Sequence, residues 1–109
     1  MVGRAKVLEK HEEAKLVREL KRLGIHHIKL TSPGRRGLPD RLILLPEGKA
    51  VFIELKAPGR EGKLSPNQEI EISRLKLLSF PLLVSSDAAE CVEWILQFIR
   101  DTSNGMDSA

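Results

Sequence analysis

Apolar residues recur every three or four positions in the first quarter of the chain, and this spacing predicts an amphipathic helix from about Lys6 to Leu23. Gly24 follows at once, and glycine is favoured just past a helix C-terminus. The next segment, Ile25 to Leu30, is short, partly alternates between apolar and polar residues and leads into a Gly-rich loop. These features predict a strand.

Two further apolar runs lie between Pro39 and Lys56, joined by the turn Pro46-Glu47-Gly48. A type I turn with its glycine in the left-handed conformation would make a three-residue loop, which predicts a hairpin that pairs Leu45 with Lys49. A loop of two or four residues would change that register. Both faces of the strands are apolar, and this pattern indicates helices on both sides of the sheet.

The second half of the chain contains a strong helix start. Ser65 can cap the helix, Pro66 suits its first position, and Gln68 completes a capping box. We therefore expect a helix that ends near Ser79.

A short apolar run from Phe80 to Ser85 predicts a buried strand, and Ser86 or Asp87 can cap a final amphipathic helix. The predicted order is α-β-β-β-α-β-α. Because the last strand arrives after a crossover helix, it should lie parallel to one hairpin strand through a right-handed connection. The expected fold class is α/β, a mixed β-sheet flanked by helices.

The composition of the 109 residues, 41% hydrophobic and 30% charged, indicates one small domain over residues 1–100 and a polar tail over 101–109. A net charge of +3 permits nucleic-acid binding. The single cysteine, Cys91, excludes an internal disulfide, and the three histidines give no zinc-binding spacing. With no signal-peptide core and no run of transmembrane length, we expect a soluble protein in a reducing, cytoplasmic compartment.

Charged residues interrupt the apolar hairpin at one end. The predicted register places Asp40 directly opposite Glu54, and Lys56 points to the same side of the strand as Glu54. Two carboxylates at that separation repel each other unless they share a proton or a cation. This arrangement predicts a site for a divalent metal ion.

The run SPGRRGLPDRLILLPEGKAVFIELKAPG, followed by LSPNQ, resembles the VRR-NUC family of the PD-(D/E)xK nucleases, in its small stand-alone form. The resemblance covers about residues 9 to 99 and implies a restriction-endonuclease-like core. It implies that Asp40 and Glu54 bind the metal, and that the backbone carbonyl of Leu55 completes the coordination. It also implies catalytic roles for Lys56 on the attacking water, for Gln68 and for a glutamate of the first helix.

Alignment within that first helix indicates Glu13 as the acid, with Glu9 and Glu12 as neighbouring alternatives. The metal would be Mg²⁺ or Mn²⁺, which stabilises the charge that builds on a phosphodiester during hydrolysis and acidifies a bound water. Lys56 could position or deprotonate that water, or only stabilise charge.

Each of these residues also has an alternative interpretation in which its role is only structural. Lys56 could be an ion-pair partner of Glu54, Gln68 could serve only the capping box, and Glu13 could be a solvated helix residue. Basic residues surround the first acid of the hairpin and follow the second, and we expect DNA contacts from four of them, or a solubilising surface in their place. These four are Arg35, Arg36, Arg60 and Lys63.

The resulting prediction is a metal-dependent, structure-selective DNA endonuclease, which by the family resemblance resolves Holliday junctions as a homodimer. Its expected partners are branched DNA and a second copy of the chain, with no membrane and no small-molecule cofactor. The alternatives are a flap, duplex-repair or restriction-type nuclease of the same fold, and a non-catalytic DNA-binding module.

Overall fold

The first apolar stripe forms helix α1 (Arg4–Arg22) in the computed structural model, which describes residues 3–31 and 34–107. Leu16 and Leu20 are buried on one face of this helix. Gly24 follows with φ of 69°, and its N–H donates to the carbonyl of Lys21 at 3.1 Å. The predicted helix and its terminating glycine are therefore confirmed.

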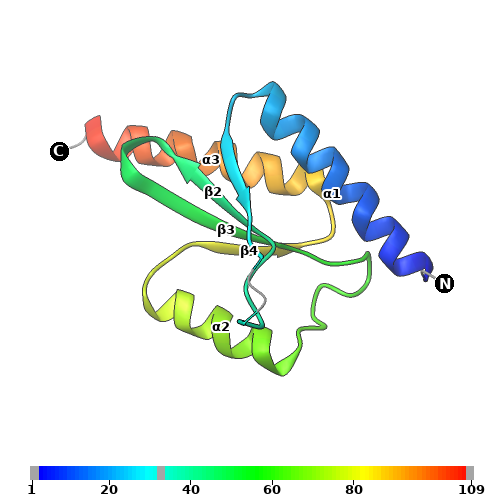
Figure 1. The fold of residues 1–109 in the computed structure, drawn as a ribbon. Coiled ribbons are helices and arrows are strands. Elements are labelled where there is room, and N and C mark those ends of the chain that lie inside the picture. Colours follow the sequence, from blue (N-terminus) through cyan, green and yellow to red (C-terminus); the bar gives the residue numbers. More distant parts are fainter. Residues whose placement is uncertain (1–2, 32–33, 108–109) are drawn as a thin grey trace.

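Four strands form one sheet in the order β1-β2-β3-β4 (Figure 1). They are β1 (His26–Lys29), β2 (Arg41–Leu45), β3 (Lys49–Leu55) and β4 (Leu82–Ser85). The first three pair antiparallel, and β4 lies parallel to β3. Together with the helices, this confirms the order α-β-β-β-α-β-α and the mixed sheet of an α/β fold.

The hairpin has the predicted register, with Leu45 opposite Lys49. The turn itself differs from the predicted type I geometry, because Glu47 and Gly48 both have positive φ, at 65° and 73°. The N–H of Lys49 donates to the carbonyl of Pro46, so the turn, labelled η1 (Pro46–Gly48), has the character of type I′. That geometry matches the right-handed twist of the paired strands, which favours it over the predicted turn.

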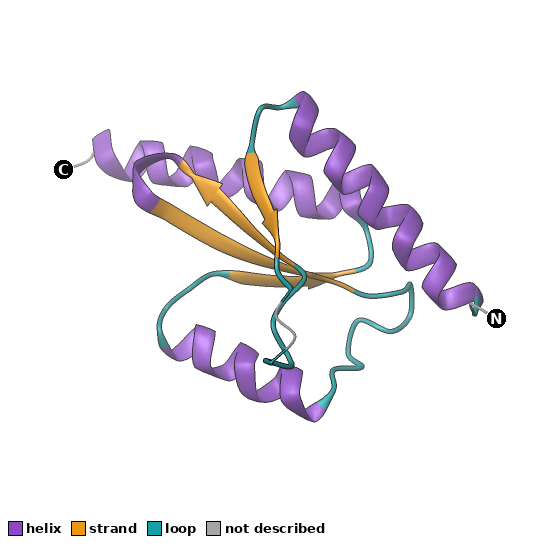
Figure 2. Ribbon diagram, in the orientation of Figure 1, coloured by secondary structure: helices purple, strands orange, loops and turns teal. Residues whose placement is uncertain are grey.

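The core lies between the sheet and two helices, α1 and α3 (Ala88–Asp107), which cover the same face (Figure 2). Apolar side chains from all three layers are fully buried there, and each contributes roughly 1.5–3 kcal/mol through burial. Those with no exposed surface are Leu16, Leu20, Ile43, Val51, Ile53, Cys91 and Ile95.

The remaining helix, α2 (Pro66–Leu77), lies on the opposite side of the sheet, as Figure 1 shows. Helices on both sides were predicted, but α2 leaves part of this face uncovered. Ile28 and Leu44 are exposed there, next to the edge-to-face contact between Phe52 and Phe80. The sheet therefore carries an apolar surface on its α2 side.

Helix α3 begins after Asp87, whose Oδ1 accepts a hydrogen bond of 3.1 Å from the N–H of Glu90. It continues to Asp107, so most of the segment expected as a polar tail, residues 101–109, is helical, while residues 108–109 lie outside the described part. A hydrogen bond of 2.8 Å from Gln97 to Asp101 joins successive turns there. None of the helices in the described ranges is long and apolar enough to cross a membrane.

Candidate active site

Asp40 and Glu54 lie side by side where β2 begins and β3 ends. Each carboxylate accepts a hydrogen bond from the backbone of the opposite strand. The N–H of Asp40 donates to Oε1 of Glu54 at 3.1 Å, and the N–H of Leu55 donates to Oδ2 of Asp40 at 2.7 Å. The predicted juxtaposition of the two acids therefore follows from the hairpin register.

Burial makes this pair costly to ionise. Glu54 is only 3% exposed, and burial, followed by the charge of Asp40, raises its pKa to about 7, although Lys56 acts in the opposite direction. Burial also raises the pKa of Asp40, against the effect of its bond from the Leu55 N–H. The site thus holds two acids whose charge is opposed by their surroundings, as is common where a function needs them.

Lys56 and Gln68 complete one side of the pair. The Nζ of Lys56 lies 3.3 Å from Oε2 of Glu54 and donates to Oε1 of Gln68 at 2.9 Å. The Nε2 of Gln68 donates to the same Glu54 oxygen at 2.8 Å. Gln68 also accepts from the N–H of Ser65 at 3.0 Å, which closes the capping box of α2. The capping role and the site contact therefore occur together and are not alternatives.

Helix α1 borders the other side of the pair. Glu9 and Glu13, one turn apart, line a pocket of about 160 Å³ together with Asp40 and Leu55. Burial and then the charge of Asp40 raise the pKa of Glu9. Glu12 points elsewhere, because its carboxylate accepts from the N–H of Ala88 at 2.9 Å.

Glu13 is already paired within the protein. Its Oε2 lies 3.2 Å from Nζ of Lys29 and 3.4 Å from Nη2 of Arg41. Arg41 is buried, so Glu13 supplies a counter-charge that a buried guanidinium requires. This places Glu13 beside the candidate site with a structural contact of its own.

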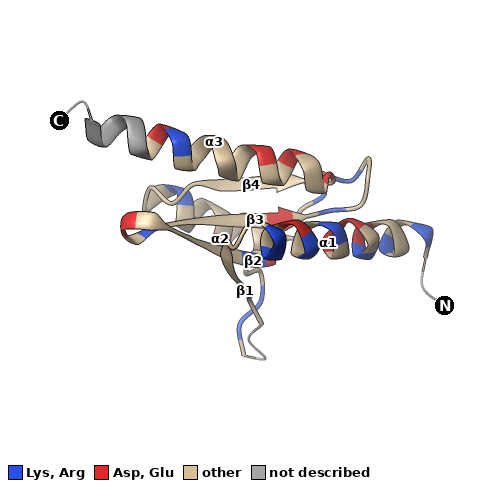
Figure 3. Ribbon diagram, turned by 90° about the horizontal axis from the view of Figure 1, so that it is seen from above, with Lys and Arg blue, Asp and Glu red and all other residues tan. Residues whose placement is uncertain are grey.

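Three lysines at this pocket were not singled out from the sequence. Lys6 and Lys10 lie one turn apart on α1, and Lys29 ends β1. The spacing of four residues between Lys6 and Lys10 matches that between Glu9 and Glu13, and it indicates that each pair shares a helix face. This four-residue spacing is the feature of the sequence from which the position of Lys6 and Lys10 beside the two glutamates could have been predicted. Figure 3 shows acidic and basic segments of α1 close to the acidic end of β3.

The donor set suits a hard divalent cation. Two carboxylates and the carbonyl of Leu55 are oxygen ligands, and Mg²⁺ needs only one or two protein carboxylates because it retains several waters. Within residues 3–31 and 34–107, no group of three or more His, Cys, Asp or Glu side chains is arranged to hold a metal ion. An ion at this place would therefore be held by Asp40 and Glu54 alone among the acids, with water or substrate in its other positions.

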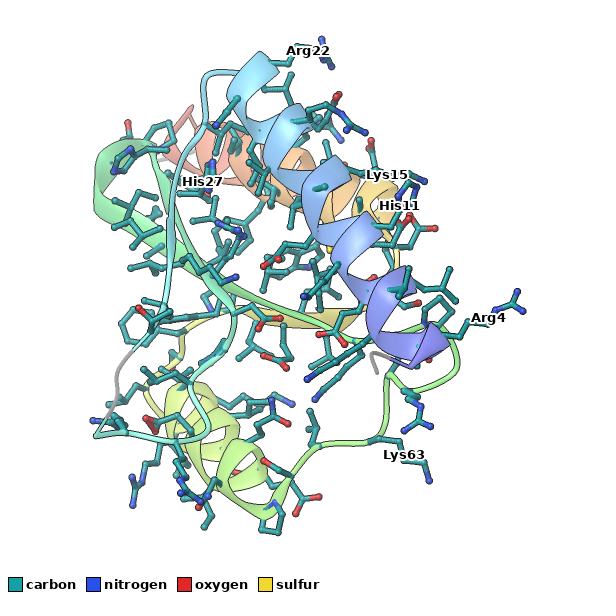
Figure 4. The ribbon with its side chains drawn as sticks, turned by 45° about the vertical axis from the view of Figure 1, so that its right-hand side comes forward. Arg4, His11, Lys15, Arg22, His27 and Lys63 are labelled. Carbon is teal, nitrogen blue, oxygen red and sulfur yellow. The ribbon has the colours of Figure 1, made fainter. Side chains whose placement is uncertain are left out.

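The four basic residues expected to contact DNA lie in two loops. Arg35 and Arg36 precede β2 and border the N-terminal half of α2. Arg60 and Lys63 are exposed in the loop after β3, where successive turns place the Lys63 N–H 2.9 Å from the carbonyl of Arg60. Figure 4 shows Lys63 projecting outward from the loop below the N-terminal end of α1, where Arg4 lies. The first loop thus borders α2, which carries Gln68, and the second follows β3, which carries Glu54.

The sequence model of the VRR-NUC domain matches residues 5–85. The chain belongs to the VRR-NUC family. A solved structure titled "VRR_NUC domain" has a TM-score of 0.68 and 27% sequence identity, covering 81% of this chain and 94% of that one. The chain is also 47% identical over 77 residues to "Putative nuclease p44" of Acyrthosiphon pisum secondary endosymbiont phage 1, a match that covers 71% of this chain and 76% of the relative.

The VRR-NUC match confirms the resemblance inferred from the sequence, and the structural similarity confirms the fold. The matched residues include every candidate site residue, from Glu9 on α1 to Gln68 on α2. They end at Ser85, so helix α3 lies outside the VRR-NUC match. In this chain α3 serves the core, through Cys91 and Ile95.

Proposed function

We propose that this VRR-NUC domain is a metal-dependent DNA endonuclease that hydrolyses phosphodiester bonds at the Asp40–Glu54 pair. Membership of the family supports nuclease activity. The observation that carries the proposal is the pair itself: a buried Glu54 and a half-buried Asp40, each bonded by the backbone of the other's strand, with Lys56 and Gln68 in contact with Glu54. A purely structural hairpin gains nothing from two such acids, because their ionisation is opposed by burial.

Asp40, Glu54 and the carbonyl of Leu55 would hold Mg²⁺ or Mn²⁺. Such an ion, when bound, stabilises negative charge on the phosphate oxygens and acidifies a water. Gln68 fixes the orientation of Glu54, since its Nε2 lies 2.8 Å from Oε2. Lys56 supplies a positive charge beside the same oxygen and can position the attacking water or stabilise the developing charge.

For the helix acid, the structure offers Glu9 and Glu13 as candidates. Glu13, favoured from the sequence, is shared by Lys29 and Arg41. The pKa of Glu9 is raised, first by burial and then by the charge of Asp40, as expected for a carboxylate that borders Asp40. We propose that both border the substrate or its metal-bound water, with Glu9 the more available carboxylate.

The basic loops lead to a prediction about binding. Replacing Arg35, Arg36, Arg60 and Lys63 together by Ala should weaken affinity for every DNA shape and flatten its salt dependence, by about one in slope for each phosphate that is no longer neutralised. The measurement is fluorescence anisotropy with labelled DNA across a salt series. Arg22→Ala, at the end of α1 far from Arg4 in Figure 4, is the control and should leave the slope unchanged. An unchanged slope in the fourfold variant would make these residues solvated surface charges.

We further propose that the substrate is branched DNA, a Holliday junction cut by a homodimer. Two active sites related by a two-fold axis suit a two-fold junction. The exposed apolar side chains Ile28 and Leu44, beside the Phe52–Phe80 pair, support association of two copies, because such a surface is more stable away from water. The general-nuclease alternative predicts no such preference for branched DNA.

The junction proposal is tested by comparing substrates of matched sequence. The protein should sediment as a dimer and introduce paired nicks into a four-way junction in Mg²⁺ or Mn²⁺, while linear duplex is cut far more slowly. Ca²⁺ should support binding with little turnover, because its larger, looser coordination shell positions the nucleophile poorly. Equal rates on junction, flap and duplex would favour the general nuclease, and binding without cutting in any divalent ion would favour the binding module.

A further inference from the structure

Glu71 is a buried acid that the candidate active site does not use. It lies on α2, and its side chain is only 6% exposed. A buried carboxylate needs cations or donors around it. Its Oε1 accepts from Nε of Arg35 at 2.9 Å and also from Nη2 of that residue, while Oε2 lies 3.9 Å from Nη1 of Arg74. One acid thus contacts two arginines from different elements.

Both arginines remain open to solvent while Glu71 holds them. The side chain of Arg35 is 57% exposed and that of Arg74 is 65% exposed. A guanidinium has five N–H donors, and a contact along one edge leaves the others for a ligand. Holding the side chain in place also removes conformational entropy that ligand binding would otherwise cost.

The loop that carries Arg35 is fixed to α2 at a second point. Gly37 has φ of 89°, and a Cβ built there would lie 2.3 Å from the backbone oxygen of Asn67. Only glycine allows this approach, so the loop packs directly on the first turn of α2. The result is an open pocket of about 200 Å³ lined by Arg35, Arg36, Asn67, Ile70, Glu71 and Arg74.

We propose that this pocket, the arginine pocket, binds a second backbone phosphate of the DNA, close to the phosphate at which the strand is cut. Glu71 is the residue that positions Arg35 and Arg74 for this contact. Three guanidinium groups outnumber the one carboxylate, and arginine suits phosphate because its planar fork matches the oxygens. Neither Arg74 nor Glu71 emerges from the family motif residues, so the site extends the DNA contact beyond the two loops.

The location supports this use. Gln68, which contacts Glu54 and Lys56, precedes Glu71 by three residues on the same helix, an advance of about 4.5 Å along its axis. A strand placed at the acid pair therefore passes near the arginine pocket. The inference rests on the proposed nuclease function, because it assigns a second phosphate of the same substrate.

The first test exploits the sign of a charge change. Removing an acid near DNA normally tightens binding, because repulsion falls. If Glu71 positions the arginines, Glu71→Gln should instead weaken binding to a short duplex in Ca²⁺ by roughly fivefold. Glu69→Gln, an exposed position on the same helix, is the matched control and should leave binding equal or slightly tighter. Tighter binding by Glu71→Gln would overturn the positioning role.

The second test separates positioning from a general structural effect. In an Arg35→Ala, Arg74→Ala background, Glu71→Gln should no longer weaken binding, because there is nothing left to position. An equal weakening in both backgrounds would overturn the proposal. Arg74→Ala alone, at an exposed site, should lower the salt slope by about one, and an unchanged slope would remove the pocket from the DNA interface. If wild-type protein neither binds nor cuts DNA, the proposed function itself fails; if it does both, the failure concerns only the arginine pocket.

Discussion

Glu54→Gln is expected to lower the rate of DNA cleavage by about 10³-fold or more. A metal ion at this site supplies several kcal/mol of transition-state stabilisation, and each 1.36 kcal/mol corresponds to a factor of about ten in rate. The amide of glutamine is a weak ligand, and it cannot replace the charge that binds the ion. Asp40→Asn should have a comparable effect, because its carboxylate lies beside that of Glu54 at the paired ends of the two strands.

DNA binding should survive both substitutions. Each removes one negative charge close to where phosphates lie, so affinity should stay the same or increase. The measurement pairs single-turnover cleavage in Mg²⁺ with anisotropy on the same DNA. Glu69→Gln, which removes an exposed acid from α2, provides the matched control and should cleave normally. Cleavage close to the wild-type rate by Glu54→Gln or Asp40→Asn would remove the acid pair from the active site.

The part of this site that the sequence predicts well depends on one register. A three-residue loop is enough to place Asp40 opposite Glu54, and the pairing of Leu45 with Lys49 confirms the alignment. The conformation of the turn was predicted less well, because Glu47 occupies a positive φ that is unusual for a residue other than glycine. Register and turn type are separate questions, because the number of residues in the loop sets which residues pair and does not by itself fix the sign of φ at each of them.

The side-chain contacts between different helices, strands and loops could not be predicted from local patterns in the sequence. The capping box of Gln68 is a local pattern, but its bond to Glu54 requires α2 to pack beside β3. The pairing of Glu13 with Arg41 and of Glu71 with Arg35 depends in the same way on how elements meet. Local spacing indicates which face a residue occupies and does not indicate its partner on another element.

The uncovered part of the sheet has a similar explanation. Apolar residues on both faces predicted helices on both sides, and helices are present on both. One short helix, α2, cannot cover four strands, so Leu44 and Ile28 remain exposed. The pattern of apolar and polar residues along a strand predicts that a face of the sheet is covered. It does not indicate whether a helix or a second copy of the chain covers that face.

The cost of the acid pair should be visible in protein stability without metal. The pKa of Glu54 is about 7 in the folded chain, against 4.5 as its ordinary value. Because the folded state binds this proton more tightly, the contribution of Glu54 to stability falls as pH rises from about 4.5 to about 7, and the full cost is present above that range. A difference of this size corresponds to an energy on the order of 3 kcal/mol.

Glu54→Gln should therefore be more stable than wild type in chelator at pH 8, by a melting-temperature difference on the order of 10 °C, and should lose this advantage below about pH 5. Asp40 remains in the variant and can balance the charge of Lys56, whose ammonium also donates to Gln68. Thermal melts followed by circular dichroism at both pH values make the comparison, with Glu69→Gln as the control that should track wild type.

Addition of Mg²⁺ or Mn²⁺ at pH 8 should reverse the order of the two proteins. A cation that binds the folded state raises wild-type stability by mass action and relieves the repulsion between Asp40 and Glu54, whereas the variant lacks one of the two ligands. The same difference between Glu54→Gln and wild type at pH 5 and pH 8 would show that ionisation of Glu54 costs nothing. A gain at pH 8 that the metal leaves unchanged would mean that the two acids are paired at this place for a reason other than metal binding.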